Sequence, residues 1–128
     1  MGVLKDRSFQ FALTIVSLSK CLVEEKKEYV MSKQLLRSGT SIGANIREAQ
    51  NAQSRADFIH KLSISQKECD ETLYWLELLS QSKYIKEEEF NVAFKDANEL
   101  LKMLRSAIIT SKSNNVVRED EVEYNTNN

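Results

Sequence analysis

The residues of this chain that could do chemistry are one histidine, two cysteines and a few closely spaced carboxylates. Asp57 precedes His60 by three residues, the spacing of the Glu-x-x-His motifs that bind di-iron centres in helical bundles. Glu68 and Glu71 share this spacing. Such a centre needs a second motif of this kind, and the chain has a single histidine. We therefore expect no metal, and expect the glutamates to form salt bridges or hydrogen bonds.

Nucleophilic catalysis has no better support in the sequence. Cys69 follows His60 by nine residues on one predicted helix, about 13 Å by helical rise, so the two cannot pair within a subunit. Gly39 and Gly43 lie inside a predicted helix, which excludes a phosphate-binding loop. Cys21 and Cys69 are typical of reduced core thiols in a cytoplasmic protein. We expect no enzymatic activity, no cofactor and no small-molecule substrate.

The two glycines point instead to close helix packing. Glycine inside a helix costs about 1 kcal/mol relative to alanine, so the close approach of another backbone should offset that cost. At helical spacing both glycines fall on one face. Its members are Leu35, Leu36, Gly39, Ile42, Gly43, Ile46 and Ala49.

The elements that position these residues are four predicted helices. They span about residues 4–28, 33–52, 55–82 and 87–112, with Ser32 as the cap of the second and a capping box from Ser54 to Asp57 starting the third. The chain has no proline, which favours long helices joined by short turns. We predict an all-α, antiparallel, up-down-up-down four-helix bundle over residues 1–112. Residues 113–128 show no periodicity and are predicted to be an acidic, disordered tail.

The first and third helices carry more apolar surface than one bundle core needs. The first has a second stripe on its far side, and the third has a second line that mixes bulky apolar groups with carboxylates. These surplus faces predict a homo-oligomer with Trp75 as an anchor. The alternative is that bundle packing alone absorbs both stripes. The candidate interface residues are Phe9, Leu13, Val16, Ile64, Trp75 and Leu78.

Polar residues flank the glycine face and suggest a polar network between the second and third helices. We expect Arg47 to pair with a carboxylate of the third helix and thereby to favour one register of packing. The candidate members are Asn45, Arg47, Glu48, Glu68 and Glu71.

Charge gives weak support for nucleic acid. The chain has 18 basic and 19 acidic residues; the last sixteen hold one arginine and four acids, which leaves 17 basic and 15 acidic residues, a net charge of +2, for residues 1–112. This is far from the strongly basic footprint of a nucleic-acid-binding domain. No apolar run is long enough to span a membrane and no signal peptide is evident, so a cytoplasmic protein is expected.

Residues 36–49 (Leu-Arg-Ser-Gly-Thr-Ser-Ile-Gly-Ala-Asn-Ile-Arg-Glu-Ala) resemble the signature of a bacterial family of four helix bundle proteins. These are also called intervening-sequence proteins, because some are encoded within insertions in 23S ribosomal RNA genes. Residues 62–65 (Leu-Ser-Ile-Ser) and 71–76 (Glu-Thr-Leu-Tyr-Trp-Leu) are similar to the same family. The likeness covers about residues 8–110, and the order and separation of the segments both fit.

The resemblance implies a left-handed bundle that assembles as a ring-like homopentamer. A related branch, the accessory proteins of diversity-generating retroelements, is similar in fold and binds reverse transcriptase and nucleic acid, but it is markedly basic. In a ring, five copies of a few cations on one rim would concentrate positive potential; solvated helix charges are the alternative role for them. These candidate contacts are Arg37, Arg47, Arg55 and Lys61.

Taken together, the sequence predicts a non-enzymatic oligomeric assembly module, associated by resemblance with RNA or a ribonucleoprotein. The alternative is a protein-binding adaptor whose ring presents helix faces or the acidic tail to a partner protein. Salt-dependent RNA binding would favour the first function, and association with one protein that survives nuclease treatment would favour the second.

Overall fold

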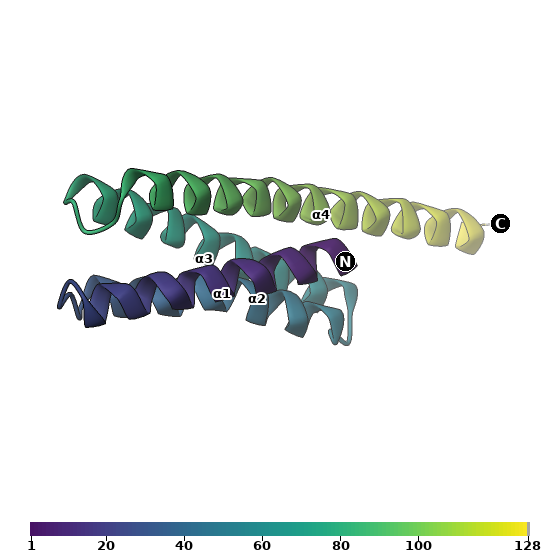
Figure 1. The fold of residues 1–128 in the computed structure, drawn as a ribbon. Coiled ribbons are helices and arrows are strands. Elements are labelled where there is room, and N and C mark those ends of the chain that lie inside the picture. Colours follow the sequence, from purple (N-terminus) through teal and green to yellow (C-terminus); the bar gives the residue numbers. More distant parts are fainter. Residues whose placement is uncertain (128) are drawn as a thin grey trace.

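The computed structural model describes the backbone of residues 1–127 and the side chains of residues 1–114. The backbone forms four helices: α1 (Gly2–Glu24), α2 (Met31–Gln50), α3 (Arg55–Gln81) and α4 (Glu87–Asn127). Helix α1 contacts α2 and α4, and α3 contacts the same two helices, so each helix lies beside its neighbours in sequence and α4 closes the bundle against α1 (Figure 1). The predicted all-α four-helix fold is confirmed. In the described residues no helix is both long and apolar enough to cross a membrane.

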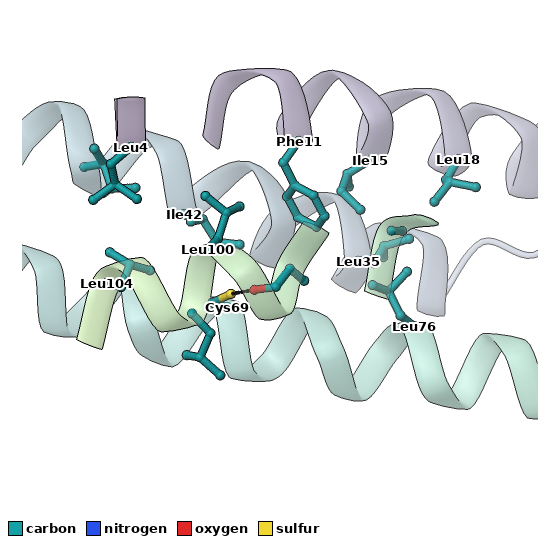
Figure 2. Close-up of a cluster of buried hydrophobic side chains, with 14 of the residues drawn as sticks. Leu4, Phe11, Ile15, Leu18, Leu35, Ile42, Cys69, Leu76, Leu100 and Leu104 are labelled. Atoms are coloured by element: carbon teal, nitrogen blue, oxygen red, sulfur yellow. Dashed lines mark hydrogen bonds between the residues drawn. The ribbon is translucent and has the colours of Figure 1, made fainter. Parts of the chain in front are cut away.

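The core is built from the apolar stripe of each helix. Phe11 and Ile15 of α1 point toward Ile42 of α2, Leu76 of α3 and Leu100 of α4, and all five are almost fully buried (Figure 2). Burying an aliphatic or aromatic side chain of this size contributes about 1.5–3 kcal/mol, so these stripes supply most of the drive to form the bundle.

Helix α3 starts where the sequence predicts, because its cap is local. The Ser54 hydroxyl accepts a hydrogen bond from the Asp57 amide at 3.0 Å. This is half of a capping box, and it satisfies one of the four amides that a helix start leaves unpaired.

Helix α2 starts differently from the prediction. The Glu28 carboxylate caps it, accepting hydrogen bonds from the amides of Val30 at 3.1 Å, Met31 at 3.0 Å and Ser32 at 2.7 Å. Ser32 therefore lies inside the helix, where its buried hydroxyl donates to the Glu28 carbonyl at 2.7 Å. The preceding helix, α1, ends at Glu24 rather than near residue 28, because Lys27 adopts a left-handed φ of 55°.

Helix α4 continues through Asn127, beyond the predicted end near Lys112 and beyond the ends of the other three helices (Figure 1). The prediction ended α4 where its apolar stripe ends. The stripe shows only how far α4 packs in the bundle, and the helix itself continues beyond it. The predicted disordered tail, residues 113–128, falls mostly outside the residues whose side chains the structure describes.

Candidate interaction surfaces

The two glycines of α2 lie against α1. A Cβ atom placed on Gly39 would sit 2.7 Å and 2.8 Å from the two γ-carbons of Ile15. A Cβ atom on Gly43 would lie 3.3 Å from the Ser8 hydroxyl and 3.4 Å from the Ser8 carbonyl oxygen. The absence of side chains at both positions lets α1 approach α2 closely. Helical spacing alone does not identify Ile15 or Ser8 as the partners.

Helix α2 meets α3 through small buried polar residues. The Thr72 hydroxyl donates to the Glu68 carbonyl at 2.7 Å and lies 2.9 Å from the Ser38 hydroxyl. One turn or more along, the Ser65 hydroxyl donates to the Ile42 carbonyl at 2.8 Å. Every hydroxyl here has a partner, so burial of these groups carries no unpaired-group penalty, and the bonds fix the register of the two helices.

This register places Arg37 opposite two carboxylates. Its guanidinium lies 3.3 Å from the Glu68 carboxylate and also bonds the Glu71 carboxylate. Burial raises the pKa of Glu68. The positive charge of Arg37 lowers this pKa and the negative charge of Glu71 raises it, and the pKa is raised overall. The hydrogen bond to Glu71 in turn raises the pKa of Arg37. When both carboxylates are ionised, the three groups together carry a net charge of −1.

The pairing expected of Arg47 is thus made by Arg37. Arg47 follows ten residues later, about 15 Å along the helix, and among the described residues it forms no ion pair. The other predicted network members are also apart from the carboxylates. The Asn45 amide donates to the Ser41 carbonyl at 2.8 Å, and Glu48 lies 4.0 Å from the Lys61 ammonium.

The chain's own bundle covers the surplus apolar residues of α1 and α3 unequally. Phe9 and Leu13 of α1 are each 50% exposed, and Leu78 of α3 is 38% exposed. Val16, Ile64 and Trp75 are half-buried. The Trp75 indole nitrogen is itself inaccessible to solvent and has no hydrogen-bond partner within the described residues. Trp75 packs against the core cluster of its own chain, so bundle packing covers most of the apolar side chains of the α3 line, whereas Phe9 and Leu13 of α1 stay exposed.

Three of the four candidate nucleic-acid contacts gather near the turn between α2 and α3. Arg47 and Lys61 line a shallow pocket of about 690 Å³, and Arg55 lines a neighbouring pocket of about 640 Å³. Glu48 and Asp57 share the first pocket with the two cations, so its charge is nearly balanced. The fourth candidate, Arg37, lies away from this end, in the ion-pair cluster described above.

The residues that could do chemistry are kept apart. His60 is exposed, whereas the Cys69 thiol is buried and donates to the Ala97 carbonyl at 3.1 Å (Figure 2). Burial raises the pKa of Cys69 to about 12. A hydrogen bond to Glu25, at 3.2 Å, raises the pKa of Cys21. Both thiols are therefore protonated and weakly nucleophilic at neutral pH, and in the described part of the chain no three metal-binding side chains come together.

Comparison with known proteins places this arrangement in a family. No curated protein matches the chain. A crystal structure of a protein of unknown function from the S23 ribosomal protein family of Bacteroides thetaiotaomicron is similar, with 60% sequence identity and a TM-score of 0.81. The similarity covers 82% of this chain and 97% of that one. A family model described as 23S rRNA-intervening sequence protein matches residues 3–106. As the resemblance of residues 36–49 predicted, the chain belongs to the 23S rRNA-intervening sequence protein family.

Proposed function

We propose that this protein is a non-enzymatic assembly module: a ring-like homopentamer of the bacterial cytoplasm that associates with RNA or a ribonucleoprotein. The observation that carries self-association is the half-exposed apolar side chains of α1 and α3, including Phe9, Leu13 and Leu78. Single exposed apolar residues are ordinary on protein surfaces. Stripes of them at helical spacing are typical of interfaces, because their removal from water contributes about 25 cal/mol per Å².

The association with RNA is supported by names and by the placement of three cations. The family takes its name from 23S rRNA, and the similar solved structure is assigned to a ribosomal protein family. Arg47, Arg55 and Lys61 lie at one end of the bundle. A ring would repeat these cations around one rim, and repetition raises the local potential even where each subunit is nearly neutral.

The RNA proposal is tested by measuring the affinity of the assembled protein for a structured fragment of 23S rRNA over a series of salt concentrations. We expect affinity to fall with salt, and Arg47→Glu combined with Lys61→Glu to reduce both affinity and salt dependence. Lys95→Glu on exposed α4 is the matched control and should leave binding unchanged. An assembled protein that binds no RNA at low salt would contradict the proposal.

The second candidate function is a protein-binding adaptor, and the charge balance favours it. Arg37 is already paired with Glu68 and Glu71, and Glu48 and Asp57 offset two of the other cations. An adaptor would keep one defined protein bound after nuclease treatment, at a fixed ratio to the ring. Loss of all bound material on nuclease treatment would rule it out.

A further inference from the structure

A groove runs along the surface between α1 and α4, the two helices whose contact closes the bundle (Figure 1). It consists of a hollow of about 250 Å³ and a second hollow of about 580 Å³, and Gln10 and Thr14 of α1 line both. On α1 the lining residues extend from Asp6 to Leu18, about 18 Å by helical rise. The groove is therefore long enough for about three turns of another helix.

The groove is acidic. Its two hollows are lined by four carboxylates and one cation. The cation, Arg7, is already paired, because its guanidinium bonds the Glu99 carboxylate and lies 3.6 Å from the Met103 sulfur. Within residues 1–114 none of the four carboxylates forms an ion pair. These carboxylates are Asp6 of α1 and Glu88, Glu89 and Asp96 of α4.

The groove also exposes apolar surface. Phe11, Leu18 and Leu100 line its bottom and belong to the core. Val92 lines its α4 side and is 59% exposed. Because Val92 belongs to α4, the self-association proposed for α1 and α3 does not account for its exposure. On the α1 side, Leu13 is shared between the groove and the apolar stripe of that helix.

We propose that the groove holds a basic amphipathic helix of a partner protein, and this inference rests on the adaptor function, the second candidate above. Apolar side chains of that helix cover Val92 and the bottom of the groove. Lysines or arginines two turns apart meet Glu89 and Asp96, which are seven residues apart and so lie about 10.5 Å apart along α4. Unpaired carboxylates repel the phosphates of RNA, so charge selects a cationic protein segment as the occupant.

The walls of the groove determine the conformation of the bound segment. Both walls are helices, whose backbone groups are bonded within each helix, so they offer no amides or carbonyls to an extended strand. A strand in the groove would lose water from its own backbone groups without gaining partners for them. A helix makes these bonds internally and presents only its side chains, as in other complexes that place a helix in a groove.

The test measures the affinity of the full-length chain for three labelled synthetic peptides by fluorescence anisotropy. The first is a helix-forming peptide of about fifteen residues, with leucines along one face and lysines two turns apart beside them. The second has serines in place of the leucines, and the third has glutamates in place of the lysines. We expect only the first peptide to bind, with an affinity that falls as salt is added.

A charge-reversal variant tests the carboxylates. Glu88→Lys combined with Asp96→Lys should weaken binding of the first peptide at least about tenfold, because like charges then meet in the groove. Asp70→Lys combined with Glu77→Lys on α3 is the matched control. It changes the net charge equally, at exposed positions outside the groove, and should leave the affinity unchanged. Circular dichroism checks that both variants are folded.

A second variant tests the apolar contact without changing the charge. Val92→Gln should weaken binding of the first peptide about fivefold, because part of the apolar area covered on binding is lost. Ile109→Gln is the control, since Ile109 is 64% exposed on the same helix and lies outside the groove.

The inference is overturned if the wild type binds none of the peptides, if the leucine-free peptide binds as well as the first, or if the groove variants bind like the wild type. It is also overturned if Glu88→Lys with Asp96→Lys loses the assembly that the wild type forms in sedimentation, because the groove would then hold a second copy of this chain. The adaptor function is judged separately, since loss of all bound material on nuclease treatment contradicts it whatever the peptides do.

Discussion

At the residue scale, the contact that matters most for the fold is the one beside Gly39. A methyl group there would sit 2.7 Å from a γ-carbon of Ile15, closer than carbon atoms approach without displacement. Because Ile15 is fully buried, it has little room to move. The distance between α1 and α2 therefore depends on the absence of a side chain at Gly39.

We therefore expect Gly39→Ala to lower the free energy of unfolding by about 1–3 kcal/mol, the usual cost of overpacking a core. Gly43→Ala is the matched comparison. The same gain of about 1 kcal/mol in helix propensity applies at both positions, but the Gly43 Cβ would lie 3.3 Å from the Ser8 hydroxyl, so at that position the gain offsets the milder crowding. Urea unfolding at one fixed protein concentration measures both. Equal losses at the two positions would contradict the account.

The sequence predicts that Gly39 and Gly43 allow another helix to approach closely, but it does not identify the residues of that helix which they contact. Composition and helical spacing identify the face on which Gly39 lies. The identity of Ile15 as its neighbour depends on the position of α1 along α2, which helical periodicity does not determine.

At the scale of the element, α2 depends on a cap that comes from the preceding loop. Burial raises the pKa of the Glu28 carboxyl, but hydrogen bonds from the amides of Met31, Ser32 and Val30 outweigh it, so the pKa is lowered overall. A lowered pKa in the folded state means that the ionised carboxylate stabilises the fold above the unfolded-state pKa. That stabilisation is lost as pH falls through the folded-state value.

We expect Glu28→Gln to reduce stability at pH 7 by about 1 kcal/mol, as loss of a helix cap does. The difference from the wild type should shrink as pH falls from the unfolded-state pKa through the lowered folded-state pKa, because the wild-type carboxylate then becomes protonated too. Thermal unfolding between pH 7 and pH 3 measures this, with the exposed Glu24→Gln as the control. A difference that does not change with pH would show that the charge of Glu28 plays no part.

Between α2 and α3, the Arg37 ion pairs are exposed enough to contribute modestly. A double-mutant cycle of Arg37→Ala and Glu71→Ala should give a coupling energy of about 0.2–1 kcal/mol, decreasing with added salt. The same cycle with Arg47→Ala in place of Arg37→Ala should be additive, because Arg47 lies about 15 Å further along α2. Coupling of Glu71 to Arg47 but not to Arg37 would refute the observed register.

These elements also show where reasoning from sequence stops. Ser54 and Asp57 form a cap within one turn of chain, so their pattern alone predicts the start of α3. Glu28 lies in the loop before α2 and accepts hydrogen bonds from the first amides of that helix. Its position in the sequence does not distinguish it as a cap from the neighbouring glutamates. Arg37 and Arg47 are equally plausible partners for Glu71 until the α2–α3 register is known, and that register is fixed by buried hydroxyls such as Ser38 and Thr72.

At the scale of the whole molecule, four amphipathic stripes predict four helices, and the structure agrees. The second apolar stripe of α1 leaves Phe9 and Leu13 half-exposed, while that of α3 is mostly covered by the bundle and leaves Leu78 38% exposed. The sequence identified those faces because surplus apolar surface is visible in helical periodicity. It could not show that the bundle covers Trp75 and leaves Phe9 and Leu13 exposed, which follows only from the contacts of the bundle.

The central claim, that copies of this chain cover each other's exposed apolar side chains, is tested most directly by the mass of the assembly. Native mass spectrometry, supported by sedimentation at micromolar concentration, should give five times the chain mass of 14.7 kDa. A predominant species of 14.7 kDa under the same conditions would contradict the claim, because Phe9, Leu13 and Leu78 would then remain exposed in solution.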